Sequence, residues 1–86
     1  MSPSSENFRD ALRDLLGNAE ALGFAAVDVN SGNLHRKVGG YPGSDHRMLI
    51  CCEVMYNAMA PGDEIVSQPD SGKGASVVVR YKLPRS

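Results

Sequence analysis

The 86-residue sequence predicts an α+β domain in which three helices are combined with a small antiparallel sheet. Apolar residues recur every three or four positions over residues 8–22, residues 75–83 are rich in β-branched side chains, and Gly/Pro-rich segments separate such stretches. A chain this short closes one hydrophobic core, and its 42% hydrophobic and 22% charged residues are typical of a globular protein. We therefore expect a flexible lead over residues 1–5 and a single domain over residues 6–84.

The N-terminal part predicts a helix followed by a short strand. Ser4 or Ser5 can cap the helix, because a hydroxyl accepts from the unsatisfied amides of the first turn. The helix is amphipathic over residues 7–22 and ends at Gly23. Its expected core face consists of Phe8, Ala11, Leu12, Leu15, Leu16, Ala19 and Leu22. Residues 24–30, FAAVDVN, then have the propensity of a short strand.

The middle of the chain predicts two helices separated by a tight turn. The segment NSGN offers caps for a short helix over residues 34–38, which Gly39 and Gly40 end. YPGS then forms a turn, and Ser44 or Asp45 is expected to cap a longer helix over residues 45–59. An apolar stripe on this helix joins Met48, Cys51 or Cys52, Met55 and Met59.

Two strands complete the predicted order. Residues 63–68 and 75–83 are joined by the Pro/Gly-rich segment PDSGKG, and the strand at residues 24–30 is expected to pair with this hairpin. Helix, strand, helix, helix, strand, strand is the order of a winged helix-turn-helix domain. The competing fold is a plain α+β domain whose helices lie on one face of a three-stranded sheet.

The formal net charge of −1 conceals an asymmetry between the two parts of the chain. Residues 1–30 carry two basic and five acidic side chains, whereas residues 31–86 carry seven basic and five acidic ones. A basic bias in one part of a chain is typical of a nucleic-acid footprint. It also arises by chance in short sequences.

The segment before the third helix supplies the first group of candidate DNA contacts. A helix N-terminus attracts phosphate, and the planar fork of Arg47 fits a phosphate or the O6/N7 edge of guanine. Ser44 and His46 stand beside Arg47 in the sequence and are expected to add contacts. Arg36 and Lys37, on the second helix, are expected to contact the DNA backbone.

The hairpin supplies the second group. Lys73 lies at its glycine-rich tip, where backbone approaches a phosphate closely, as in the wing of a winged helix. Arg80 and Lys82 alternate with Val79 and Tyr81, so both are expected on the outward face of the last strand. DNA binding requires that the cations from these separate elements lie on one side of the molecule.

Each basic group also has a plainer interpretation. Ser44 and Asp45 can serve only as helix caps, with Arg47 in solvent. Outward charges on a strand also prevent edge-to-edge aggregation. His35 lies between apolar neighbours and is more often a buried, hydrogen-bonded side chain than a ligand.

Neither a metal site nor a catalytic site is expected. Two histidines and two cysteines match a zinc-site count, but adjacent Cys51 and Cys52 project about 100° apart on a helix and no CxxC or HxxxH spacing occurs. A nucleophilic pair of Cys52 with His35 or His46 requires an exposed, electropositive thiol, whereas these cysteines fall in an apolar stripe. We expect both cysteines to be reduced, buried side chains, and we expect no cofactor.

The function predicted from these residues is non-enzymatic binding of double-stranded DNA, with a possible homodimer. The alternative is a protein-interaction module that docks through the apolar surplus of the third helix: Leu49, Ile50, Met55, Tyr56 and Met59. No apolar run is long enough to span a bilayer, and the N-terminus lacks the features of an export signal. A cytoplasmic protein without membrane contact is therefore expected.

The motifs LHRKVGGYP, HRM, CC and VM, with the closing RYKLPR, span residues 34–85. On these motifs the sequence resembles a family of small uncharacterised bacterial proteins with the pattern LHRxVGGYP…HRM…CC…VM…RYxLPR. The resemblance implies a bacterial cytosolic protein, and the family resembles companions of HNH-type nuclease or restriction genes. The chain itself contains no nuclease motif.

Overall fold

The computed structural model describes residues 4–39 and 47–85 and has the predicted order of elements. These elements are α1 (Ser5–Ala21), β1 (Ala26–Asn30), α2 (Ser31–Val38), α3 (Met48–Asn57), β2 (Glu64–Ser67) and β3 (Val78–Lys82). The prediction of an α+β fold with three helices and a small antiparallel sheet is thereby confirmed. Every helix in the described part of the chain falls short of the length and apolarity that a bilayer-spanning segment requires.

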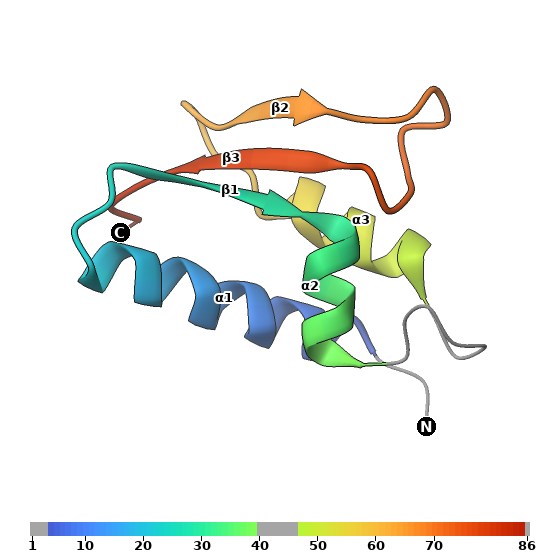
Figure 1. Cartoon of the computed structure of the whole chain (residues 1–86), viewed down its shortest axis with the longest axis horizontal. Helices are drawn as coiled ribbons and strands as arrows, with labels where there is room; N and C mark the ends of the chain where they lie inside the picture. Colours follow the sequence, from blue (N-terminus) through green and yellow to red (C-terminus); the bar gives the residue numbers. More distant parts are fainter. Residues whose placement is uncertain (1–3, 40–46, 86) are drawn as a thin grey trace.

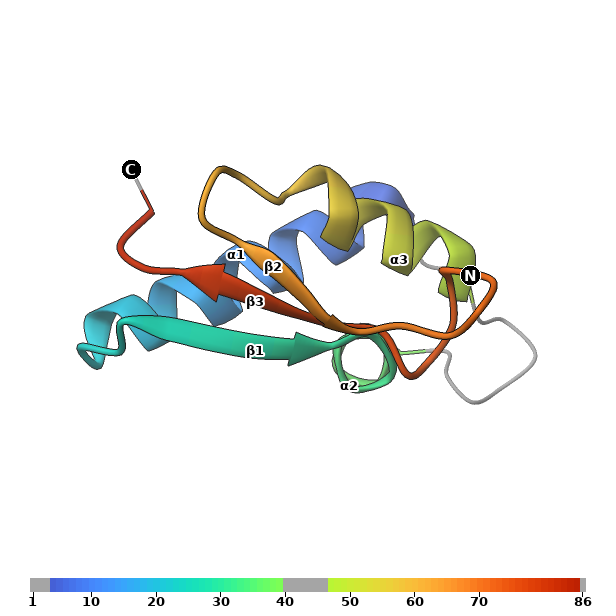
Figure 2. The ribbon, with the colours of Figure 1, turned by 90° about the horizontal axis from the view of Figure 1, so that it is seen from above.

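The three strands form an antiparallel sheet in the order β1-β3-β2, so β3 is the central strand. The predicted pairing of the first strand with the hairpin is confirmed, with Asp28 opposite Arg80. On the other edge Glu64 lies opposite Arg80, and an irregularity between Ile65 and Ser67 shifts the register of β2. The helices lie on one side of this sheet (Figures 1 and 2). The charged side chains of Asp28, Arg80 and Lys82 are exposed on the opposite face.

Helix α1 begins with a capping box. The Asn7 amide donates to Ser4 Oγ at 3.2 Å, and the Ser4 amide donates to Asn7 Oδ1 at 2.9 Å. Of the two predicted caps, Ser4 or Ser5, the structure has Ser4, and the helix already starts at Ser5, inside the segment predicted as a lead. The helix ends before Gly23, whose φ of +86° favours glycine. Its buried face consists of Phe8, Leu12, Leu16 and Ala19.

The core lies between the inner face of the sheet and the helices. Val79 and Tyr81 of β3 are fully buried, and the Tyr81 hydroxyl donates to the Met55 carbonyl of α3 at 2.7 Å. This bond satisfies the one polar atom that the tyrosine brings into the core. The buried side of α3 is broader than the predicted stripe, because it includes both cysteines and Val54: Met48, Cys51, Cys52, Val54 and Met55 are all buried.

Helix α3 begins later than predicted. Its first residue is Met48 and its N-cap is Arg47, which makes no side-chain capping bond. The prediction that this helix starts at residue 45 is therefore wrong, and the predicted caps Ser44 and Asp45 lie outside the described residues. The physical reason is tertiary: the Arg47 amide donates at 2.7 Å to Nε2 of buried His35, which fixes the helix start from another element.

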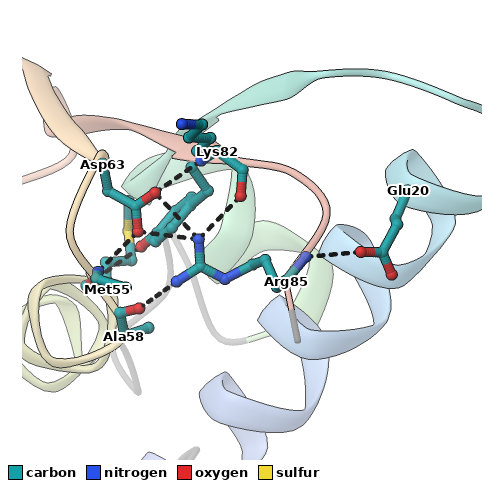
Figure 3. A network of polar contacts seen from close by, with 8 residues as sticks. Glu20, Met55, Ala58, Asp63, Lys82 and Arg85 are labelled. Atoms are coloured by element: carbon teal, nitrogen blue, oxygen red, sulfur yellow. Dashed lines mark hydrogen bonds and ion pairs between the residues drawn. The ribbon is translucent and has the colours of Figure 1, made fainter.

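A network of polar contacts around the buried carboxylate of Asp63 holds the C-terminal tail (Figure 3). The side chain of Asp63 is 1% exposed and forms an ion pair at 2.9 Å with Arg85. It also accepts the amides of Lys82 at 2.7 Å and Ala60 at 2.8 Å. Burial alone would raise the pKa of Asp63, but these amides and the guanidinium outweigh it and hold that pKa below its ordinary value.

Arg85 joins this carboxylate to the rest of the molecule. Its guanidinium donates to the Ala58 carbonyl at 2.7 Å and lies 5.2 Å from the centre of the Tyr81 ring. Its backbone amide donates to Glu20 of α1 at 2.7 Å (Figure 3). Arg85, one residue beyond the predicted domain end, thus ties the tail to α1, α3 and the sheet.

Candidate nucleic-acid interface

The junction of α2 and α3 holds the first group of predicted DNA contacts. Helix α2 starts at Ser31, three residues before the predicted start. The Asn30 side chain caps it by accepting the Asn33 amide at 3.0 Å. The Asn30 side chain also donates to the Ala75 carbonyl at 2.9 Å, which fixes α2 against the segment that leads into β3. The position of α2 is therefore set by the sheet.

Buried His35 connects all three helices. Its ring packs edge-on against Phe8 of α1, with the centroids 4.9 Å apart, and its Nε2 accepts the amide of Arg47 at the start of α3. Because Nε2 acts as an acceptor, that nitrogen carries no proton. His35 is thus the buried, hydrogen-bonded side chain of the plainer interpretation.

Three predicted cations lie around this connection. Arg36 and Lys37 are exposed on the last turns of α2, and Arg47 is exposed at the start of α3. The Arg36 guanidinium donates to Asn33 Oδ1 at 3.1 Å on the same helix. The hydrogen bond from the Arg47 amide to His35 puts the backbone of Arg47 beside α2, so these three basic residues belong to one corner, the junction of α2 and α3. Ser44 and His46, also predicted here, lie outside the described residues.

Lys73 belongs to the connection between β2 and β3, which folds back onto α3. Its Nζ forms an ion pair at 3.0 Å with Glu53 on the exposed side of that helix. The neighbouring Gly72 carbonyl accepts the Tyr56 hydroxyl, and the Gly74 carbonyl accepts the Cys52 thiol at 3.4 Å. The side chain of Lys73 therefore packs against the exposed side of α3.

Arg80 and Lys82 lie on the open face of the sheet, on the side away from the helices. Their predicted outward orientation is confirmed, since both are exposed while Val79 and Tyr81 are buried. The predicted cations therefore occupy more than one side of the molecule, so the expectation that all of them lie on one side is wrong. The three basic residues at the α2–α3 junction and Lys73 lie beside α2 and α3. Arg80 and Lys82 lie on the far face of the sheet.

Carboxylates surround Arg80 on that face. The guanidinium donates to both oxygens of Asp28 on β1, at 2.7 and 3.0 Å, and to Glu64 on β2 at 3.2 Å. The hydrogen bond from Arg80 is the main cause of a lowered pKa of Asp28. Both carboxylates already accept from the Arg80 guanidinium, so Arg80 is a poor phosphate contact.

The cysteines are packing residues. Cys51 and Cys52 are both free and completely buried, as expected from the apolar stripe. Burial raises the pKa of the Cys51 thiol to about 12, with a smaller contribution from Cys52 beside it. Within residues 4–39 and 47–85, no three histidine, cysteine or acidic side chains gather in a way that could hold a metal ion.

Helix α3 exposes fewer apolar side chains than the protein-interaction hypothesis requires. Met55 is fully buried, Met59 packs against the core, and Tyr56 is bonded to the β2–β3 connection. Leu49 remains 63% exposed, with half-buried Ile50 beside it.

Sequence reasoning missed a groove along α1. The groove holds about 460 Å³ and lies between α1, the C-terminal half of α3 and the tail. Arg9 and Arg13 of α1 border it. Their spacing of four was a signal, because it puts both on one side of the helix.

Searches of protein-family models, curated proteins and solved structures found no match for this chain.

Proposed function

We propose that this protein binds double-stranded DNA, without catalysis, as a winged helix whose α2–α3 corner faces the duplex. The observation that carries the proposal is the meeting of Arg36, Lys37 and Arg47 from two helices around the buried His35–Arg47 hydrogen bond. The bond fixes the backbone of Arg47 relative to α2. The backbone positions that carry the three charges are therefore fixed relative to one another before any ligand arrives, which lowers the entropy cost of binding.

The element order and the sheet order support the same proposal. In a winged helix the second of two packed helices approaches the major groove, and the loop of the last hairpin lies beside it. Here the β2–β3 connection touches α3 through the Lys73–Glu53 ion pair and the Tyr56 hydroxyl. In this proposal Lys73 contacts the flanking DNA backbone, and Ser44 and His46, outside the described residues, stay sequence-based predictions. Arg80 and Lys82 belong to the far face and are left out of the interface.

Fluorescence anisotropy with a labelled duplex, at a series of salt concentrations, tests the proposal. We expect binding that weakens as salt rises, because phosphate contacts release counterions. Arg47→Gln and Lys37→Gln should each weaken binding and reduce the slope of log K against log salt by about 1. The matched control is Arg80→Gln, which removes the same charge from the far face and should leave the slope unchanged.

Two results would contradict the proposal. One is the absence of binding at low salt. The other is an equal loss for Arg80→Gln and Arg47→Gln, which would mean that only the total charge matters and that the α2–α3 corner has no special role.

The exposed Leu49 favours a second candidate, in which α3 docks on a protein partner. Leu49→Lys separates the two functions in the same anisotropy experiment. If α3 faces DNA, the added cation should strengthen duplex binding and steepen its salt dependence. If DNA binding stays undetectable for both proteins while a partner that binds the unaltered chain is lost by Leu49→Lys, the second candidate is favoured.

A further inference from the structure

The groove along α1 has an apolar wall and a charged border. The wall is formed by side chains from three elements: Leu12 and Leu16 of α1, Val54 of α3, and Leu83 of the tail. Arg85 closes one end, where its guanidinium is held by Asp63 and the Ala58 carbonyl. Each of these four side chains is at most 8% exposed, so only a small apolar area remains for another surface to cover.

Helix α1 borders the groove with a stripe of four residues: Arg9, Arg13, Gly17 and Glu20. The spacing of four, four and three puts them on one side of the helix. The stripe is basic at its start and acidic at its end. Arg13 is paired at 2.8 Å with Asp10 on its own helix, and its side chain is 76% exposed, so its guanidinium is accessible.

Gly17 lies in the middle of this stripe. Apart from Gly17, its two chain neighbours and the nearby backbone of its own helix, no atom of the described residues comes within 4 Å of the place that a Cβ would occupy there, and the residue has no backbone conformation that requires glycine. A glycine inside a helix costs about 0.5–1 kcal/mol relative to alanine. Nothing within residues 4–39 and 47–85 accounts for that cost, whereas close approach of another helix would do so.

We propose that a second copy of this chain packs on the groove, with the two α1 helices antiparallel about a two-fold axis near Gly17. An antiparallel arrangement puts the basic end of each stripe beside the acidic end of the other. Arg13 and Glu20 are seven residues apart, about 10 Å along the helix, so a two-fold axis midway between them joins each arginine to the glutamate of the other copy. The contact is isologous and therefore closes at a dimer.

Two features prepare the surface for this association. The Arg85 amide donates to Glu20 Oε1 at 2.7 Å and so orients the carboxylate before the second copy arrives. The aliphatic stems of Arg9 and Arg13 can cover the apolar wall of the facing groove while their guanidinium groups reach its rim. The dimer does not depend on the proposed DNA binding, because the stripe is on α1 and the basic corner is formed by α2 and α3.

Sedimentation velocity of the full chain, from low micromolar to near-millimolar concentration, tests the proposal. We expect a species of twice the 9.2 kDa chain mass that increases with concentration. Arg13→Glu and Glu20→Lys should each weaken association at least tenfold. An equal mixture of the two variants should restore it. In the mixed dimer the glutamate introduced in one copy faces the lysine introduced in the other, and the remaining Arg13 faces the remaining Glu20.

Gly17→Gln keeps the test decisive if Glu20→Lys disturbs the tail. The new side chain has free space in the monomer and a higher helix propensity than glycine, so the thermal midpoint should rise while association is lost. Asp14→Lys, on an exposed position of α1 outside the groove lining, is the control and should leave association unchanged. A chain that stays monomeric throughout, or a dimer that tolerates both Gly17→Gln and Arg13→Glu, overturns the proposal.

Discussion

Asp63→Ala is expected to lower the free energy of unfolding by about 3 kcal/mol. The substitution leaves the Arg85 guanidinium and two backbone amides without the carboxylate that accepts from them. The value lies at the lower end of the range for a broken buried ion pair, because the Arg85 side chain is 24% exposed and water can reach it. Urea denaturation followed by circular dichroism measures the change.

The same carboxylate gives the protein a specific acid sensitivity. The pKa of Asp63 is lowered in the folded state, so its stabilising contribution is complete above the ordinary carboxyl pKa of about 3.9. That contribution is lost as the pH falls from there through the lowered pKa. Asp63→Asn should therefore be less stable than the unaltered protein at neutral pH and show a flatter decline of stability in acid.

The control for both experiments is Asp70→Asn, which changes an exposed aspartate in the β2–β3 connection. It should leave the stability at neutral pH nearly unchanged. If Asp63→Ala cost no more than Asp70→Asn, the network around Arg85 would not contribute to stability.

Phe8→Ala is expected to destabilise the protein by about 3–5 kcal/mol. Phe8 is fully buried and its ring packs against His35, so its removal leaves a cavity at the place where the three helices meet. The loss also frees the imidazole that holds the Arg47 amide. Thermal and urea denaturation should both report the change, and much of this small domain should be unfolded at room temperature.

The chain contains its own matched control, because its only other phenylalanine is exposed. Phe24→Ala removes the same ring from a position that is 58% exposed and should change the stability by less than about 0.5 kcal/mol. Equal effects of the two substitutions would show that Phe8 is not part of a packed core.

The sequence was sufficient for elements whose signals are local. The three- and four-residue spacing of Phe8, Leu12 and Leu16 predicted α1, and the alternation around Tyr81 predicted both β3 and its buried face. Even the cap at Ser4 follows from the hydroxyl and the helical pattern after it. These features depend on side-chain periodicity and on hydrogen bonds within one turn, which are present in the sequence itself.

Features that depend on distant partners could not be predicted in this way. The start of α3 was misplaced because His35, twelve positions earlier, determines where the Arg47 amide is bonded. The outward orientation of Arg80 was predicted, but its two carboxylate neighbours follow from the register of three strands. The groove on α1 was missed for the same reason, since two of its walls come from α3 and the tail.

The order of the strands has a consequence for how the polypeptide acquires its shape during synthesis. The strand that lies between the other two is also the latest of the three to leave the ribosome. Until residues 78–82 have emerged, the earlier strands have no neighbour in register and the helices lack the buried side chains of Val79 and Tyr81. Folding of this domain is therefore expected only after residues 78–82 have been synthesised. A nascent chain stopped at Val77 should behave as an unstructured coil with at most transient helices.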